Sequence, residues 1–221
     1  MQKRCVYSLP LLFLLTTQQV HATDEKAPWA RGLDSPELGK LLQELNQQYG
    51  PDAVALLGSL LNATIYSGSV LTATVRVHGT EMRQDGNFLI FRVETGIIFN
   101  SRTHNKTSRL TTLWAKILEK AFAQMTTMKV PADGVMVDLL YYQKSYPETD
   151  ELHKHVDEPG TIEEAKFYFP VESLRAFLNQ ELPAPALLAR TAVLVDNTPA
   201  PLILPGVAVE EAKQVSTRTE K

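Results

Sequence analysis

The chain of 221 residues contains a single cysteine, Cys5, which lies close to the N-terminus. One thiol cannot form an internal disulfide bond, and it cannot supply the several ligands of a thiolate zinc centre. The amino-acid sequence also contains no apolar run of about 20 residues, the length that a transmembrane helix requires. These absences exclude a disulfide scaffold and a cysteine-ligated zinc protein.

Motifs of common catalytic sites are absent as well. The sequence has no Gly-x-Ser-x-Gly, Gly-x-x-x-x-Gly-Lys-Ser/Thr, Gly-x-Gly-x-x-Gly or His-Glu-x-x-His motif and no calcium-binding loop. The segment Leu57-Gly58-Ser59-Leu60 lacks the second glycine of a nucleophile elbow and lies in an apolar stretch. Because many active sites are assembled from residues distant in sequence, these absences argue against an enzyme without excluding one.

Charge of one sign is also lacking. The chain has 22 basic and 25 acidic residues and a formal net charge of −3, so no overall positive field would attract nucleic acid. Its 44% of hydrophobic residues is typical of globular proteins and excludes a disordered or collagenous chain. No repeat occurs at a fixed period, and the length suits one domain with a hydrophobic core.

What the sequence does contain begins with the features of a secretory signal peptide. Two basic residues, Lys3 and Arg4, precede a largely apolar run over 5–17, and Val20-His21-Ala22 matches the small-x-Ala pattern of a cleavage site. We therefore predict a signal peptide over 1–22 with cleavage after Ala22. The alternatives are an uncleaved anchor and a plain apolar N-terminal helix.

Cleavage after Ala22 would change the composition of the working protein. Removing 22 of the 221 residues leaves 199, and the loss of two basic and no acidic residues moves the net charge from −3 to −5. Cys5 is removed too, so the mature chain would be free of thiols, which suits an oxidising compartment. We predict a soluble, periplasmic or secreted protein without a transmembrane segment.

Beyond the signal peptide, the pattern predicts an α+β fold in a single domain over 35–208. A linker over 23–34 precedes this domain, and a flexible C-terminal tail over 209–221 follows it. Ser35-Pro36-Glu37 has the residue types of a helix start, and leucines at helical spacing follow it. Gly50-Pro51 separates this helix from an apolar second one, which predicts an N-terminal helical hairpin.

The central part changes to strand periodicity. Residues 70–77 and 88–93 read as strands on either side of an Asp85-Gly86 turn, and 97–99 as a third strand or a continuation past a bulge. These strands predict an antiparallel sheet. An amphipathic helix over 110–128, capped by Ser108, should pack on one sheet face. The remaining predicted elements are strands over 135–142, 165–169 and 191–195 and a helix over 171–182.

Two groups of residues are candidate binding sites. Arg102, His104, Lys106 and Arg109 cluster ahead of the long helix, where free backbone N–H groups and arginine side chains favour an anion such as phosphate, sulfate or an acidic polysaccharide. The alternative is an ordinary polar surface loop. His153 and His155 lie among acidic residues and are the best candidates for a metal site, or else belong to a solvated acidic loop.

Two further sets of residues have a structural and a functional interpretation. The aromatic residues 141, 142 and 146 could stack on sugars, and those at 167–169 could line a pocket, but alternation along a strand more simply places half of each group in the core. Asp138 and Glu94 lie on predicted strands and are candidates for an acid–base pair, although the sequence does not determine their separation. No cofactor is indicated, and no catalytic residue is assigned.

These observations favour an exported, non-catalytic binding or accessory protein whose partner is an envelope or extracellular molecule or a small ligand. An exported hydrolase that uses scattered Asp, Glu and His residues is the alternative. A structural subunit that docks through an exposed strand edge is a third possibility.

Overall fold

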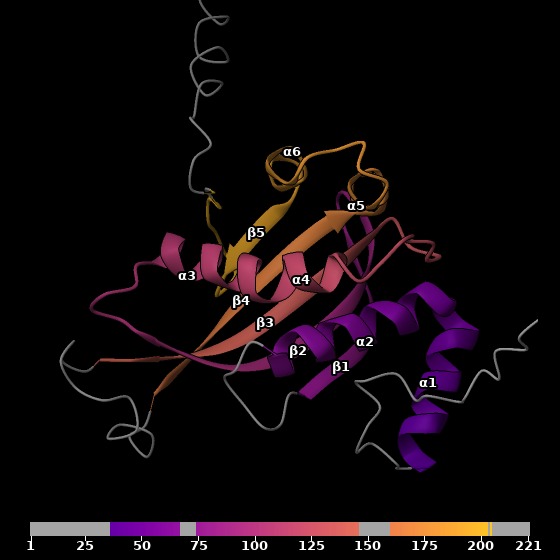
Figure 1. The fold of residues 1–221 in the computed structure, drawn as a ribbon, viewed down its shortest axis with the longest axis horizontal. Coiled ribbons are helices and arrows are strands. Elements are labelled where there is room, and N and C mark those ends of the chain that lie inside the picture. The colour runs from indigo at the N-terminus through magenta and orange to yellow at the C-terminus, as the bar shows by residue number, and fades with distance from the viewer. Residues whose placement is uncertain (1–35, 67–73, 146–159, 203, 205–221) are drawn as a thin grey trace, which may run out of the picture.

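A computed structural model describes residues 36–66, 74–145, 160–202 and 204 (Figure 1). The predicted signal peptide, cleavage site, linker, C-terminal tail and both histidines of the predicted metal site lie outside these residues. The described elements, in chain order, are α1 (Pro36–Tyr49), α2 (Pro51–Tyr66), β1 (Thr74–Arg83), β2 (Gly86–Asn100), α3 (Lys106–Leu113), the π-helix η2 (Trp114–Leu118), α4 (Glu119–Phe122), β3 (Gly134–Lys144), β4 (Thr161–Pro170), α5 (Val171–Leu178), α6 (Ala184–Ala189), β5 (Ala192–Val195) and β6 (Thr198–Pro199).

The fold is mixed α+β, with a six-stranded sheet whose spatial order follows the chain order from β1 to β6. All neighbouring strands are antiparallel except β2 and β3, which are parallel. The prediction of an antiparallel sheet is therefore wrong at its centre. The physical reason is the helical connection over 106–122, which we call the crossover helix. It returns the chain to the end of the sheet where β2 began.

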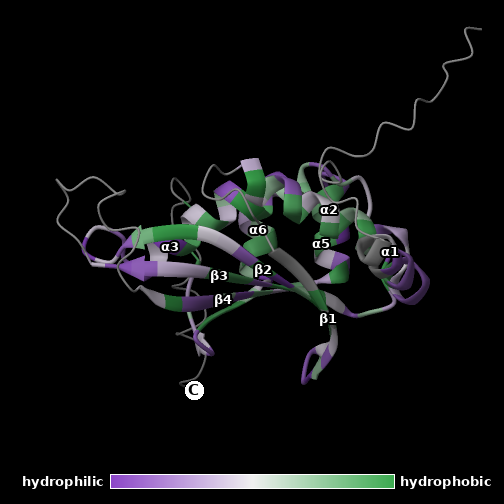
Figure 2. Cartoon of the chain, turned by 90° about the horizontal axis from the view of Figure 1, so that it is seen from below, coloured by the Kyte–Doolittle hydropathy of each residue, from purple (hydrophilic) through white to green (hydrophobic). Residues whose placement is uncertain are grey.

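The helices lie on one face of this sheet. In Figure 2, α2, α3, α5 and α6 are all on the same side of the strands, and apolar residues of these helices share one core cluster with the strands. No helix among the described residues covers the opposite face, which we call the open face. Since side chains alternate along a strand, β2, β3 and β4 present every second residue to this open face.

The first hairpin forms as its turn residues predict. Asp85-Gly86 joins β1 to β2, and Gly86 has a φ of +133°, which favours glycine. β2 then runs on through Asn100, with a register shift between Glu94 and Ile98 and a positive φ at Gly96. Of the two alternatives for 97–99, the continuation past an irregularity is therefore confirmed.

The long helical segment begins and ends earlier than predicted. Helical structure runs from Lys106 to Phe122, and its N-cap is Asn105, whose side chain accepts a hydrogen bond from the Ser108 backbone N–H at 2.8 Å. The predicted cap at Ser108 is wrong, because the asparagine three residues earlier makes that bond. Met125 and Met128 are buried although they lie beyond the helix, so their apolar spacing reflected core packing rather than helix.

The C-terminal half shows three differences from the predicted elements. β3 and β4 contain the predicted strands, but β4 begins at Thr161 and is longer. α5 ends at Leu178 rather than 182, and Gln180 at a φ of 63° closes it. The helix α6 was not predicted, because Pro183 and Pro185 read as a break. Proline is tolerated at a helix start, where its missing N–H would have no intrahelical partner.

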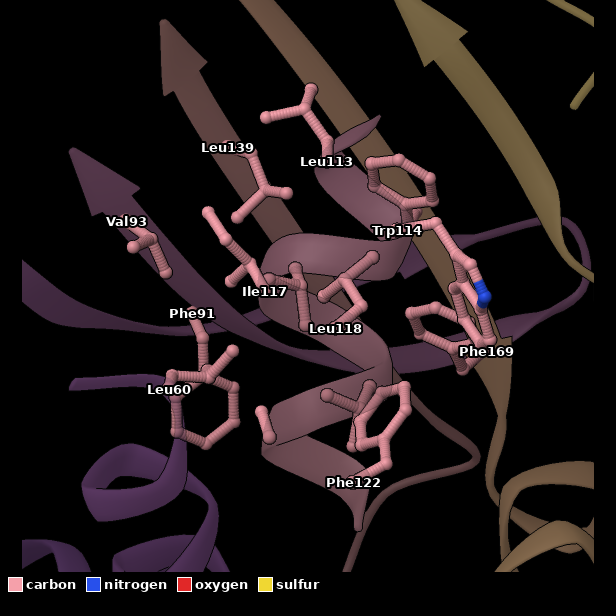
Figure 3. Close-up of a cluster of buried hydrophobic side chains, with 14 of the residues drawn as sticks. Leu60, Phe91, Val93, Leu113, Trp114, Ile117, Leu118, Phe122, Leu139 and Phe169 are labelled. Atoms are coloured by element: carbon pink, nitrogen blue, oxygen red, sulfur yellow. The ribbon is translucent and has the colours of Figure 1, made fainter. Parts of the chain in front are cut away.

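Trp114 lies in the core between the crossover helix and the sheet (Figure 3). The indole is 1% exposed and its centroid is 6.2–6.3 Å from the rings of Phe122, Phe169 and Phe177. Leu60 of α2 and Phe91 of β2 belong to the same cluster, so one core joins the helices to the sheet.

In the described ranges, no helix has both the length and the apolarity that crossing a bilayer demands.

Candidate functional site

A row of four charged side chains crosses the middle of the open face. Arg92 lies on β2, Asp138 on β3, and Glu164 and Lys166 on β4. The strand register places Arg92 opposite Asp138, and Asp138 opposite Lys166. We call these four residues the charged row.

Arg92 links the three central strands. Its Nε donates a hydrogen bond to Asp138 Oδ2 at 2.7 Å, and its Nη2 donates to Glu164 Oε1 at 2.6 Å. Lys166 Nζ lies 2.9 Å from Glu164 Oε2 and also donates to Asn197 Oδ1 at 2.9 Å. The row thus contains two cations and two carboxylates that bind one another, so its charges largely neutralise each other locally.

The two carboxyl groups have different environments. The Asp138 side chain is fully buried, whereas 20% of the Glu164 side chain and 38% of the Arg92 side chain are exposed. Burial, with a further contribution from neighbouring Glu164, raises the pKa of Asp138 to about 6 against the opposing effect of Arg92. Burial also acts to raise the pKa of Glu164, but the neighbouring side chains of Lys166, Asp138 and Arg92 lower this pKa overall.

Apolar side chains lie on both sides of the charged row along the strands. On one side, Phe88, Met136 and Tyr168 form a small buried cluster, in which the rings of Phe88 and Tyr168 meet edge to face at 5.4 Å. The Arg83 guanidinium lies 3.8 Å above the Tyr168 ring, within the range of a cation–π contact.

On the other side of the charged row, Tyr142 of β3 and Ile162 of β4 are direct register partners. They are 40% and 57% exposed, respectively, so two large apolar side chains lie side by side on the open face in contact with solvent. Alternation explains why they do so. Tyr141, the preceding residue of β3, is fully buried in the core, as the sequence predicted for half of the aromatic residues.

The residues of the predicted anion site are only partly brought together. Arg109 turns inward and is 6% exposed. Its Nη1 donates to the His104 backbone oxygen at 2.6 Å, and its Nη2 lies 3.1 Å from Glu163 Oε2. Arg102 is exposed and donates from Nε to Ser145 Oγ at 3.0 Å, while exposed Lys106 is the first residue of α3. An anion site in this loop remains a prediction.

Arg109 belongs to a buried polar network on the covered side of the sheet. Glu163 Oε2 also accepts a hydrogen bond from the Tyr141 hydroxyl at 2.6 Å. Burial and the bond to Glu163 raise the pKa of Tyr141 well above its ordinary value, so this hydroxyl remains a donor. The network connects the start of α3 to β3 and β4 and has a structural role.

Sequence reasoning identified only one member of the charged row. It paired Asp138 with Glu94, but the structure places Glu164 beside Asp138 and aligns Glu94 with Leu140. Arg92 and Lys166 were missed. Alternation within each strand placed them on a defined face, but only the parallel pairing of β2 with β3 brings the three strands together.

A groove lies away from the charged row. It has a volume of about 570 Å³, lies between α4 and α5 and is lined mainly by apolar side chains, including Phe122, Met125 and Phe177. None of the four residues of the charged row lines it. Within the described ranges, no three His, Cys, Asp or Glu residues come together in a way that would hold a metal ion.

Comparison of the chain with protein-family models, with curated proteins and with solved structures finds no match.

Proposed function

We propose that the protein is an exported, non-catalytic binding or accessory protein that contacts a protein partner through the open face of its sheet. The observation that carries this proposal is the exposed pair Tyr142 and Ile162 beside the charged row. Large apolar side chains next to each other on an exposed surface favour protein contact, and aromatic residues are frequent anchors in interfaces. The signal-peptide pattern over 1–22 supports export to the periplasm or the exterior.

The charge arrangement defines the partner that fits this face. Arg92 and Lys166 already bind Asp138 and Glu164, so the row offers no large field of one sign to an acidic or basic polymer. A partner surface with apolar side chains opposite Tyr142 and Ile162 and polar groups opposite the row is complementary to it. Such a partner is a protein rather than nucleic acid.

A photo-crosslinking amino acid at position 162 tests the proposal in cells that produce the protein. We expect a specific crosslinked product from position 162 and none from position 116. Lys116 is also exposed, but it lies on the helical segment and therefore on the side of the sheet opposite the open face. In a chain that carries the crosslinker at position 140, which lies on the open face between Asp138 and Tyr142 on β3, Tyr142→Asp plus Ile162→Asp should reduce the yield at least tenfold, since each lost interface anchor costs about 1–2 kcal/mol.

Met82→Asp is the matched control for that experiment. Met82 is also a large exposed apolar residue, at 75% exposed, but it lies near the β1–β2 turn. This variant should leave the crosslink yield unchanged. Equal crosslinking from positions 116 and 162, or an equal loss of yield in the Met82 variant, would remove the proposal.

An exported hydrolase is the second candidate, and one observation favours it. Asp138 and Glu164 are neighbouring carboxyl groups with opposite pKa shifts, a pattern shared with acid–base pairs of enzymes. The burial of Asp138 argues against this function, because a catalytic acid has to reach its substrate.

A turnover screen separates these two functions. With generic esters, phosphates and glycans as substrates, the binding function expects equal background rates for the native chain and Asp138→Asn. A turnover that this single substitution abolishes in a folded protein would establish the hydrolase instead.

We also propose the finer organisation of the domain over 35–208. α1 and α2 form a helical hairpin around Gly50, whose φ of +85° suits a chain reversal. The crossover helix is the amphipathic helix that packs on the covered sheet face, with Leu110, Leu113 and Ile117 fully buried. Both features follow from the apolar spacing and from the shared core cluster.

A further inference from the structure

The buried carboxyl group of Asp138 has one oxygen without a partner. Oδ2 accepts the hydrogen bond from Arg92, whereas Oδ1 is buried and has no hydrogen-bond donor among the described residues. Both oxygens of Glu164 are already occupied, by Arg92 and Lys166. A buried carboxylate oxygen without a donor is costly, so the cluster lacks one hydrogen.

None of the side chains around Asp138 donates a hydrogen bond to Oδ1 in the structure. β2 contributes Arg92 and, one alternate position further along, Glu94. β4 contributes Glu164 and Lys166, and Lys166 also binds Asn197 from the turn before β6. On β1, Arg76 is the register partner of Arg92. Arg92 and Lys166 already donate to carboxylate oxygens other than Asp138 Oδ1.

We propose that the charged row binds one proton, held on Asp138 Oδ1 and shared with Glu164, and that the open face thereby gains one positive charge at mildly acidic pH. With both carboxyl groups ionised, the two cations and two anions of the row sum to zero. With the proton bound, the sum is +1. The proton gives Oδ1 its hydrogen and removes the repulsion between two adjacent carboxylates. This property does not depend on any partner of the face.

The direction of the resulting pH dependence follows from the pKa of Asp138. Burial, more than the neighbouring Glu164, raises this pKa from 3.8 to about 6. A raised folded-state pKa means that the folded chain holds a proton between pH 4 and pH 6 that the unfolded chain has lost. The stability from this group is therefore present at low pH and is lost as the pH rises through 6. The lowered pKa of Glu164 makes the stability rise with pH instead, but only at pH values below the ordinary pKa of a glutamate.

Carboxyl ¹³C NMR of the full chain measures the proposed proton directly, with the Asp138 carboxyl signal assigned through bonds from the β-protons and backbone of the same residue. We expect a midpoint of 5.5 or higher for Asp138 in the native chain. Glu164→Gln should lower that midpoint by at least half a pH unit, because it removes the neighbouring negative charge. Asp85→Asn is the matched control, since Asp85 pairs with Arg83 at the exposed turn, and it should leave the midpoint unchanged.

Denaturant unfolding between pH 4.5 and pH 7 provides the second measurement. The equilibrium constant for unfolding of the native chain should rise with pH by up to tenfold per pH unit, the limit for one proton. Asp138→Asn should remove this contribution. A midpoint below 5.5 in the native chain overturns the proposal, and so does a midpoint that Glu164→Gln leaves unchanged. Since the NMR titration of the native chain needs no Asp138 variant, an unstable Asp138→Asn chain does not prevent the decision. Loss of crosslinking at position 162 would affect only the proposed function.

Discussion

Replacing Trp114 by alanine is expected to destabilise the folded chain by about 3–5 kcal/mol, the usual cost of truncating a large buried aromatic residue. Trp114 is 1% exposed and its ring lies within 6.3 Å of three phenylalanine rings, those of Phe122, Phe169 and Phe177. These rings come from the crossover helix, β4 and α5. Removing the indole would therefore leave a cavity where three elements meet, and the fixed backbone around it limits collapse.

Chemical denaturation monitored by circular dichroism measures this loss. Tyr66→Ala is the control, because Tyr66 is also aromatic and helical but is 71% exposed. It should change the free energy of unfolding by no more than about 0.5 kcal/mol. If both variants lost the same stability, Trp114 would not be at the centre of the core.

Replacing Arg109 by methionine is expected to cost about 3–5 kcal/mol, the usual penalty for removing one partner of a buried ion pair. Methionine retains much of the apolar stem but removes the guanidinium, which leaves the charge of Glu163 with only the Tyr141 hydroxyl as a described partner. The bond from Arg109 to the His104 carbonyl is lost as well. The start of α3 should therefore separate from β3 and β4.

Two control variants define the origin of that loss. Arg102→Met removes a cation from the same loop, but Arg102 is exposed, so the change should stay within about 0.5 kcal/mol. Combining Arg109→Met with Glu163→Gln should recover part of the stability, since no unpaired charge then remains. An Arg109 variant as stable as the Arg102 variant would show that the ion pair does not support the fold.

The same pair of variants tests the anion site predicted for this loop. If phosphate binds through the loop surface, Arg102→Met should weaken phosphate binding while the protein stays folded.

The inward position of Arg109 explains why the sequence could not separate a ligand-binding arginine from a structural one. Its Glu163 partner is 54 residues away in the chain, and the sequence pattern does not show which arginine faces it.

The sequence by itself determined the class of elements and much of their order. Leucine spacing around Gly50, the Asp85-Gly86 turn and the apolar strand over 135–142 all depend on interactions between residues close in the chain. Such local patterns specify which side of a helix or strand is apolar. They also predicted that Tyr141 and Tyr142 point to opposite faces of the sheet.

Only the tertiary structure decided the pairing of β2 with β3 and therefore the charged row. Strand periodicity of two residues states which side chains share a face of one strand, but not which strands are neighbours or in which direction they run. Arg92, Asp138 and Glu164 are separated by 46 and 26 residues, yet a parallel register and an antiparallel one bring them within hydrogen-bonding distance. The burial that raises the pKa of Asp138 arises only when these three strands are assembled.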